Sequence, residues 1–121
     1  AMMLPVSAPF HCSLMRPAAD AMADALATVA IKPPRVPLVA NVLARSISDP
    51  AAIVRCLVEQ VTGTVRWRES VLFMAQAGVT VFHEIGAGRV LTGLIKRIAA
   101  AADASSIGTP EDIIRFKAAH A

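Results

Sequence analysis

The sequence contains no tyrosine, one tryptophan and four phenylalanines, so aromatic residues make up only 4% of its 121 positions. Charged residues are also scarce at 17%, against the usual ~25%, whereas 55% of the residues are hydrophobic. Such a composition argues against disorder as a description of the whole chain. Low charge on a short, apolar chain indicates instead a surface that another part of a larger protein covers.

Clustered basic residues interleaved with stacking aromatics, which many nucleic-acid-binding proteins use, are missing. The 12 Lys and Arg residues are scattered, and the net charge is only +3. Long apolar runs are missing as well, because Pro, Arg or Lys interrupts each stretch before the roughly 18 residues that a membrane span needs. We therefore expect a cytoplasmic protein with no visible signal peptide that binds neither nucleic acid nor membrane.

Metal-site spacing is also absent. Cys12 and Cys56 form no CxxC motif and no Cys/His pattern, so we expect a reduced pair of thiols and no zinc.

Helical and extended patterns alternate along the chain, which predicts an α/β fold with a parallel sheet. Five helices are expected: from Ser13 to before Pro33, from Asp49 to Gly63, from Trp67 to Gly78, after the turn Gly86–Gly88, and from Thr109. Three strands are expected, at Val36–Val39, Val79–Ile85 and Ala104–Ile107. Three strands bury too small a core for a complete sheet, so the chain is expected to be part of a larger layer.

Capping residues mark several helix ends. Ser13 is the expected N-cap of the first helix, with Pro17 in its first turn. Asp49 and Thr109 each precede a proline, which is typical of an N-cap followed by the first helical position. Gly93 is expected to let its helix approach the sheet closely.

His11 is the first candidate for chemistry, because it lies where a Pro-rich loop meets a helix start and imidazole suits proton transfer near neutral pH. A structural histidine in a loop explains the same position.

None of the serines stands in a G-x-S-x-G motif, so no nucleophile is apparent. The glycines after Glu84 only weakly resemble a phosphate loop, and a tight strand-to-helix turn is the simpler interpretation. His83 is expected to pack, and His120 lies near the end of the chain.

Four blocks cover nearly the whole chain in order. They are VSAPFHCSLMRPAA from Val6, PLVANV from Pro37, LVEQV from Leu57 with VRWRESV from Val65, and EIGAGRVLTGLIKR from Glu84. In this order they resemble segments of the malonyl-CoA:acyl carrier protein transacylase family, the first of them around its catalytic histidine.

The resemblance implies a place within a larger fold. The family combines a large α/β-hydrolase-like subdomain with a small ferredoxin-like insert. Residues 1–121 would be the C-terminal part of the large subdomain, with the N-terminal part and the insert absent. The nucleophilic serine, an oxyanion-loop glutamine and an arginine that pairs with the malonyl carboxylate would lie in the missing portion. That portion is an expected partner, and the chain is expected to be inactive alone.

The resemblance also implies a reaction, the transfer of malonyl from malonyl-CoA to the phosphopantetheine thiol of acyl carrier protein in fatty acid synthesis. His11 would take a proton from the serine, protonate the departing CoA thiolate, and then deprotonate the carrier thiol. A backbone carbonyl orients the family's histidine, and Gln60 stands at the matching position. No resident cofactor or metal is implied.

Phe10 and Asn41 are the expected substrate-binding residues. In related polyketide acyltransferases a Phe before the histidine accompanies malonyl selection, because its ring fills the space that an α-methyl group needs; such exclusion is worth roughly 1–3 kcal/mol. Asn41 would line the site from a strand end, although a turn-forming Asn explains it too. Some cations are candidates for carrier docking, with solvated helix charges as the alternative: Arg66, Arg68, Lys96 and Arg97.

Two alternatives remain open. The chain could instead be the acyltransferase portion of a polyketide or multifunctional synthase, which keeps the fold and changes the context. It could also be a non-catalytic fragment that binds acyl carrier protein through its mildly basic face.

Overall fold

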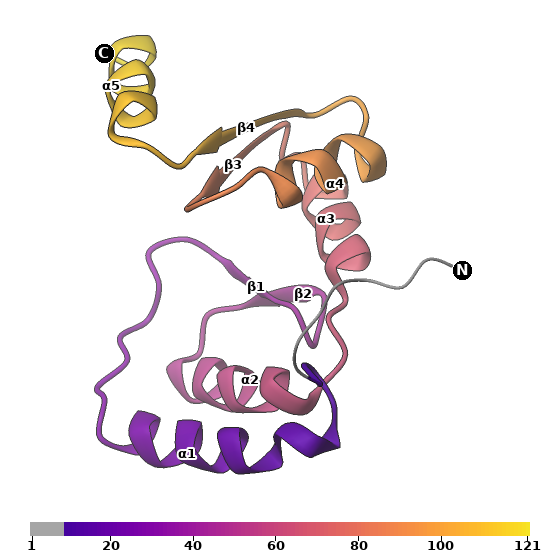
Figure 1. The fold of residues 1–121 in the computed structure, drawn as a ribbon, viewed down its shortest axis with the longest axis vertical. Helices are drawn as coiled ribbons and strands as arrows, with labels where there is room; N and C mark the ends of the chain where they lie inside the picture. Colours follow the sequence, from indigo (N-terminus) through magenta and orange to yellow (C-terminus); the bar gives the residue numbers. More distant parts are fainter. Residues whose placement is uncertain (1–8) are drawn as a thin grey trace. The chain divides into compact units, whose positions relative to one another are not determined.

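The computed structural model of the chain describes residues 9–121 and divides into two compact units, Ala1–Ser70 and Val71–Ala121 (Figure 1). Val6, Ser7 and Ala8 of the first family-like block lie outside the described residues. None of the described helices is long and apolar enough to cross a membrane. Residues 9–121 also contain no group of three or more His, Cys, Asp or Glu side chains that could hold a metal ion.

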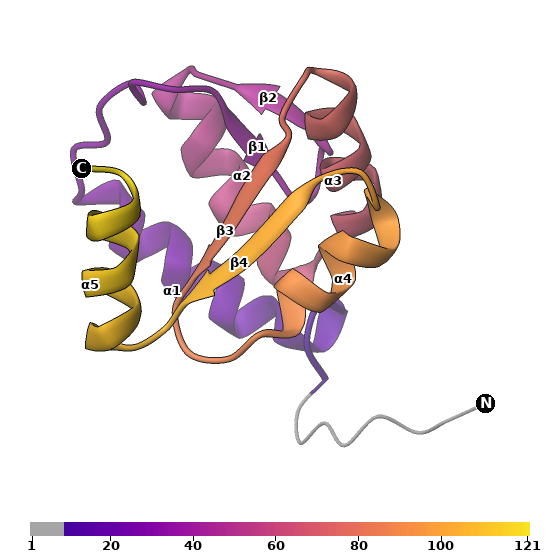
Figure 2. The ribbon, with the colours of Figure 1, turned by 90° about the horizontal axis from the view of Figure 1, so that it is seen from above.

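The first unit is a pair of packed helices with a small hairpin. A 3-10 turn, Ser13–Met15, leads into α1, Arg16–Ala27, which packs along α2, Pro50–Thr62 (Figure 2). Strands β1, Leu38–Ala40, and β2, Arg45–Ile47, pair antiparallel. Its buried apolar side chains come from α1, β1 and α2: Ala19, Ala40, Ile53 and Cys56.

The second unit is a strand–helix–strand motif followed by a terminal helix. After α3, Trp67–Gln76, which begins in the first unit, the chain forms β3, Val81–Ile85, α4, Val90–Ile98, and β4, Asp103–Ile107. Strands β3 and β4 are parallel, with Val81 opposite Asp103 and Ile85 opposite Ile107. Helix α4 packs against both strands, and α5, Pro110–Ala119, follows β4. The expected α/β class and parallel pairing are confirmed here.

Two of the expected helix starts are confirmed in atomic detail. The Asp49 carboxylate accepts a hydrogen bond from the Ala52 N–H at 2.9 Å, with Pro50 at the first position of α2. At α5 the Thr109 hydroxyl accepts from the Asp112 N–H, while the Asp112 carboxylate accepts from the Thr109 N–H. These reciprocal bonds form a capping box, so two donors that a helix start leaves unpaired are satisfied.

The prediction of Ser13 as an N-cap is wrong. Ser13 begins the 3-10 turn, in which the Met15 N–H bonds to the Cys12 carbonyl at 3.0 Å, and Met15 precedes α1 without a side-chain cap. The turn itself pairs the backbone that a serine hydroxyl would otherwise satisfy. The same helix ends at Ala27, well before Pro33, where the Thr28 hydroxyl bonds back to the Ala25 carbonyl.

The first expected strand is displaced, and its partner was not predicted. Pro37 has no N–H to donate, and β1 begins one residue after it, at Leu38, rather than at Val36. The turn to β2 contains Ala44 in a left-handed conformation, with φ of 52°, and its N–H bonds to the Ala40 carbonyl at 2.8 Å. Alanine is not a residue that marks such a turn, so the antiparallel hairpin left no signal in the sequence.

The expected role of Gly93 is also wrong. A Cβ placed at this residue would have no other heavy atom within 4 Å, apart from its chain neighbours and its own helix backbone. Gly93 therefore faces open space. The close approach occurs instead at Gly108, where a Cβ would lie 2.7 Å from the Gly86 carbonyl oxygen. The two loops that follow β3 and β4 thus contact each other through glycines.

His83, Phe116 and His120 form a cluster of rings in the second unit. The His83 Nδ1 lies 2.8 Å from the Ser105 Oγ, and its ring meets the Phe116 ring edge to face at 5.0 Å between centroids. His120 stacks on Phe116 at 4.1 Å, and its Nδ1 lies 2.8 Å from the Phe116 carbonyl oxygen. His83 is therefore a packing residue that helps hold α5 on the sheet, and His120 is part of the same ring cluster.

Glu84 caps α4 from the neighbouring strand. Its carboxylate accepts hydrogen bonds from the N–H of Thr92 at 2.8 Å, the hydroxyl of Thr92 at 2.7 Å and the N–H of Leu91 at 3.1 Å. Arg89, at the N-cap position, makes no side-chain cap. The bonds from Thr92, followed by that from Leu91, hold the pKa of the Glu84 carboxyl below its ordinary value.

We predict that Gly93→Ala raises the free energy of unfolding by about 0.5–1 kcal/mol, because alanine favours the helix and meets no obstacle. Urea denaturation followed by circular dichroism measures the change. Gly86→Ala is the matched control: it also meets no atom, but its φ of 130° strains any side chain, so it should destabilise the protein. An equal effect of both substitutions would contradict the assignment.

We predict that Glu84→Gln weakens the protein near neutral pH and that the difference from the unsubstituted chain shrinks in acid. A carboxyl with a lowered pKa stabilises the fold above its unfolded-state pKa, and this contribution is lost as the pH falls through its folded-state value. Unfolding curves between pH 7 and pH 3 measure the effect. Glu59→Gln, which removes the same charge from an exposed position on α2, is the control, and an equal effect of both substitutions would contradict the role given to Glu84.

Candidate active site

His11 adopts a backbone conformation that few residues other than glycine take. Its φ is 58°, and Ala44 is the other non-glycine residue with positive φ among those described. A left-handed conformation costs a residue of this kind about 1–3 kcal/mol and persists only where surrounding contacts hold it. It orients the histidine between an extended Cys12 and the preceding loop, immediately before the 3-10 turn. Strain of this type is frequent in active sites.

The contact that holds His11 is a hydrogen bond to the main chain of α2. Its Nδ1 lies 2.8 Å from the carbonyl oxygen of Gln60. A carbonyl can only accept, so Nδ1 carries the hydrogen and the neutral ring keeps its Nε2 lone pair free. The structure thus places the His11 and Gln60 atoms where the resemblance implied, whereas their catalytic roles stay a prediction.

The main-chain carbonyl of Gln60 is free to accept this hydrogen bond because α2 ends at Thr62, two residues beyond it. Near the end of a helix the carbonyls lack the N–H groups that further helical residues would supply, and the helix dipole concentrates partial negative charge there. The neighbouring Glu59 carbonyl accepts from the Gly63 N–H at 2.9 Å, which leaves the Gln60 carbonyl for the imidazole. This oxygen can orient the ring and stabilise its protonated form, the role that a carboxylate has in a Ser-His-Asp triad.

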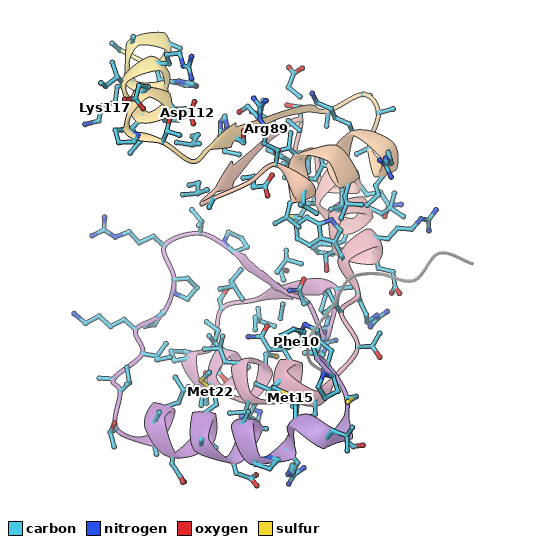
Figure 3. All side chains as sticks on the ribbon, in the orientation of Figure 1. Phe10, Met15, Met22, Arg89, Asp112 and Lys117 are labelled. Carbon is cyan, nitrogen blue, oxygen red and sulfur yellow. The ribbon has the colours of Figure 1, made fainter. Side chains whose placement is uncertain are left out.

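Asn41 and Gln60 are brought together on one small cavity, whereas Phe10 is not part of it. The cavity of about 170 Å³ lies between β1 and α2. It is lined by Leu38, Val39, Ala40, Asn41, Ile53, Cys56, Leu57 and Gln60. Phe10 is 59% exposed, and its side chain is one of those labelled in Figure 3. The substrate-binding roles of Asn41 and Phe10 therefore stay predictions.

Arg66, which the sequence offers as a candidate for carrier docking, holds the turn between β1 and β2 in place. Its N–H donates to the Asn41 carbonyl at 3.0 Å, its Nη1 to the Leu43 carbonyl at 3.2 Å, and its guanidinium pairs with Glu69. These bonds tie the β1–β2 turn to the start of α3. Arg66 is thus held within the first unit, which makes it a poor candidate for carrier docking. Its only signal in the sequence is the acidic residue three positions later.

No nucleophile accompanies His11 in residues 9–121. The one hydrogen bond of its ring there is the bond to Gln60, and no hydroxyl or thiol reaches Nε2. Burial raises the pKa of the Cys56 thiol, which disfavours the reactive thiolate. The Ser70 hydroxyl is buried and donates to the Arg66 carbonyl. The described residues thus supply an oriented base without a group for it to activate.

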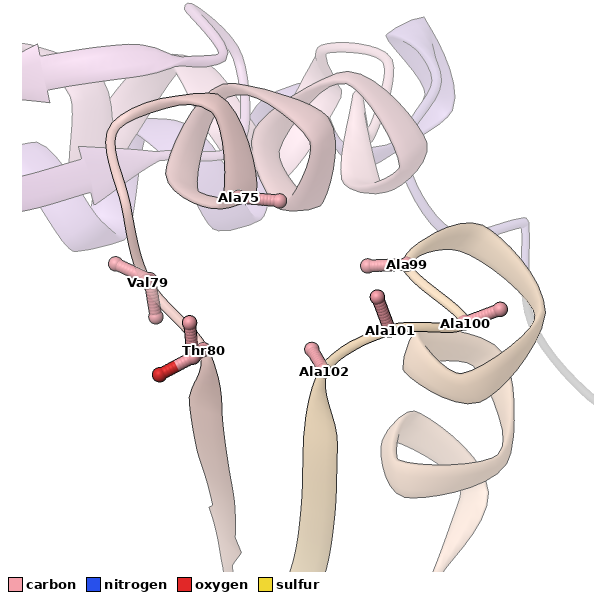
Figure 4. A pocket seen from close by; sticks show the side chains of 7 residues that line it. All are labelled: Ala75, Val79, Thr80, Ala99, Ala100, Ala101 and Ala102. Atoms are coloured by element: carbon pink, nitrogen blue, oxygen red, sulfur yellow. The ribbon is translucent and has the colours of Figure 1, made fainter.

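A second hollow, in the second unit, is lined almost entirely by apolar side chains. The hydroxyl of Thr80 is the one polar side-chain group among its lining residues. It has a volume of about 240 Å³ and lies between the end of α3, the start of β3 and the alanine run before β4 (Figure 4). Its lining consists of Ala75, Val79, Thr80 and Ala99 to Ala102. An apolar hollow of this composition has no means of catalysis.

Comparisons with known proteins give one consistent result, although no protein-family model matches the chain. The chain is 47% identical over 110 residues to the malonyl CoA-acyl carrier protein transacylase of Salmonella typhimurium LT2; the match covers 91% of the chain and 36% of that protein. The crystal structure of the acyl-carrier-protein S-malonyltransferase from Bartonella henselae superimposes with a TM-score of 0.86 and 52% identity, over 96% of this chain and 37% of that one.

A third match is a transacylase seen with its carrier. PlMCAT, a malonyl-transacylase in complex with the type II polyketide acyl-carrier protein AntF, has a TM-score of 0.82 and 42% identity, over 92% of this chain and 36% of that chain. In each case the match spans nearly all of this chain and about a third of the relative. The chain is therefore a homologue of malonyl CoA-acyl carrier protein transacylases across a segment about a third of their length.

Proposed function

We propose that this chain is the C-terminal, histidine-bearing portion of a transacylase that moves malonyl from CoA to the phosphopantetheine thiol of acyl carrier protein. The observation that carries the proposal is the 2.8 Å bond between His11 Nδ1 and the Gln60 carbonyl, which leaves Nε2 available as a base. The 47% identity to the Salmonella transacylase supports the choice of substrate class. Function in the cytoplasmic synthesis of fatty acids follows from the same proposal.

The proposed reaction has two halves that share one base. In the first, a serine of the remaining portion attacks the malonyl thioester; His11 takes the serine proton at Nε2 and returns it to the CoA thiolate as the C–S bond breaks. In the second, His11 takes the proton of the carrier thiol, the sulfur attacks the malonyl ester, and the proton goes back to the serine oxygen. Each half ends with the imidazole neutral again, and the chemistry needs no resident cofactor or metal.

The remaining portion of the enzyme is the partner that this proposal requires. Large apolar side chains are exposed in both units, among them Leu14 at 73%, Val36 at 71% and Ile85 at 81%. Strands of parallel sheets are normally covered on both faces, so Ile85 of β3 is an expected contact. The same portion would supply the nucleophile that residues 9–121 do not place beside His11.

Phe10 and Asn41 are proposed to shape the malonyl pocket. Phe10 directly precedes the strained His11, so its ring is placed by the same backbone conformation. Its exposed ring would exclude an α-methyl group once the remaining portion closes the site. Asn41, at the end of β1, shares a cavity with Gln60 and could donate its side-chain amide to the bound acyl group.

A role in polyketide synthesis is a second candidate, because the transacylase that matches at a TM-score of 0.82 is bound to a polyketide carrier protein. The chemistry at His11 would be unchanged. The carrier protein would differ, so comparing carriers from fatty acid and polyketide systems as acceptors distinguishes the two.

The mechanism depends on how α2 ends. A Cβ at Gly63 would lie 2.9 Å from the Glu59 carbonyl oxygen and 3.3 Å from a methyl of Val42. Gly63 therefore lets α2 end in a close backbone turn, and the Cβ of an alanine would force the backbone of this turn to move. If the helix continued, the Thr64 N–H would come into position to bond the Gln60 carbonyl and compete with the imidazole.

We predict that Gly63→Ala shifts His11 away from the tautomer that has its hydrogen on Nδ1. Nitrogen-15 NMR of the imidazole distinguishes the two ring nitrogens and reports the tautomer directly. Gly93→Ala is the matched control and should leave the His11 signals unchanged. Gln60→Ala should also leave them unchanged, because it keeps the main-chain carbonyl. A tautomer change in Gln60→Ala but not in Gly63→Ala would overturn the role given to the helix end.

We predict that His11→Ala lowers malonyl transfer about 100-fold or more, the usual contribution of a general base. The assay combines this chain with the part of the Salmonella relative that it does not match, radiolabelled malonyl-CoA and acyl carrier protein. His83→Ala, a packing histidine, is the control. Stable label on this chain alone, or transfer that survives His11→Ala, would refute the proposal. Carrier binding without transfer would favour the non-catalytic alternative.

A further inference from the structure

A cleft of about 540 Å³ in the second unit has a basic lining that the proposed reaction does not use. It runs along α4 and β4, and α5 closes one end. An adjoining hollow of about 450 Å³ shares Arg89, Ser106, Asp112 and Arg115 with it and reaches Gly88 and Gly108. These glycines lie in the loops after β3 and β4, at the carboxyl ends of two parallel strands. Proteins with parallel sheets usually bind their ligands at this edge.

Positive charge predominates in this cleft. Arg89, Lys96 and Arg115 line it, and Asp112 is the one carboxylate among its lining residues. The Asp112 carboxylate is already occupied, because it accepts hydrogen bonds from the N–H of Gly108 and of Thr109 and from Arg115 at 2.5 Å. These donors, led by Arg115, hold the pKa of Asp112 well below its usual range, so its charge is constant at any physiological pH. The lining keeps a formal excess of two positive charges.

Two of the cations, Arg89 and Lys96, stand at opposite ends of α4. Arg89 is the N-cap residue of α4 and Lys96 lies in its last turn, and both side chains line the cleft. The Arg89 Nε donates to the Ser106 hydroxyl at 3.0 Å, which fixes the guanidinium above β4. Within residues 9–121, neither Arg89 nor Lys96 forms a salt bridge with an acidic side chain. Their remaining donors are therefore available to a ligand.

The floor of the cleft is made of small residues. Gly93 lies between the two cations, and no heavy atom beyond its own neighbours stands within 4 Å of where its Cβ would be. Ala104, Ser105 and Ser106 of β4 complete the floor. Gly93, which was expected to pack closely against the sheet, thus leaves room for a ligand. The side chains around this space include those of Arg89 and Lys96.

We propose that this cleft binds a phosphate group. Guanidinium groups match the oxygens of phosphate in pairs, and an ammonium and a hydroxyl complete the set of donors. Cations that approach from α4 on one side and α5 on the other suit a tetrahedral anion better than a planar carboxylate. The inference is independent of the transacylase proposal, because it uses neither His11 nor Gln60.

The test is an NMR titration of the nitrogen-15-labelled chain with inorganic phosphate at low ionic strength. We expect saturable shifts confined to the amides of residues 88–96, 104–109 and 112–115, which become smaller as salt is added. Shifts spread over all basic residues, or no saturation up to tens of millimolar phosphate, would overturn the proposal. Parallel titrations with CoA and with 4′-phosphopantetheine identify the source: binding tighter than that of inorganic phosphate assigns the site to that ligand, and equal binding assigns it to free phosphate.

Matched variants locate the site. Arg89→Gln and Arg115→Gln should each weaken binding by roughly fivefold or more, the effect of losing one charge-assisted hydrogen bond. Gly93→Leu should abolish binding by filling the floor, while an unchanged circular dichroism spectrum shows that the chain keeps its helix content. Arg97→Gln removes the same charge from the same helix but outside the cleft, so it should change binding little. Equal losses in Arg89→Gln and Arg97→Gln would show non-specific attraction and refute the site.

Discussion

A single main-chain carbonyl that lacks a helical partner organises the first unit. Because α2 stops at Thr62, the carbonyl of Gln60 is left over and accepts the Nδ1–H of His11. The bond holds His11 in its strained left-handed backbone conformation, and it selects one tautomer of the ring. Helix length, backbone strain and protonation state are thereby linked at one contact.

Features set by local chemistry could be predicted from the sequence. Asp49 before Pro50 and Thr109 before Pro110 specify helix starts, because the polar side chain pairs an N–H that the helix cannot. The parallel β3–β4 pair followed from apolar runs separated by a helix. The contact of His11 with Gln60 joins residues 49 positions apart, and only the family resemblance indicated it.

Features decided by distant parts of the chain could not be predicted. The β1–β2 turn depends on a left-handed Ala44 and on the hold of Arg66 on the Asn41 and Leu43 carbonyls, neither of which has a sequence signature. The surroundings of Gly93 could not be predicted, because a glycine in a helix indicates missing side-chain volume without indicating what lies opposite. Ser13 lost its expected role to a 3-10 turn that pairs the same backbone without a side chain.

The main-chain nature of the Gln60 acceptor has an evolutionary consequence. An orienting carboxylate must be retained as Asp or Glu, whereas an orienting carbonyl is present whatever side chain occupies the position. Selection at this site would therefore act on where α2 ends and leave the identity of residue 60 comparatively free. A substitution scan of side chains would find position 60 tolerant, and the constraint would appear instead at Gly63, three residues beyond the carbonyl that accepts the imidazole hydrogen bond.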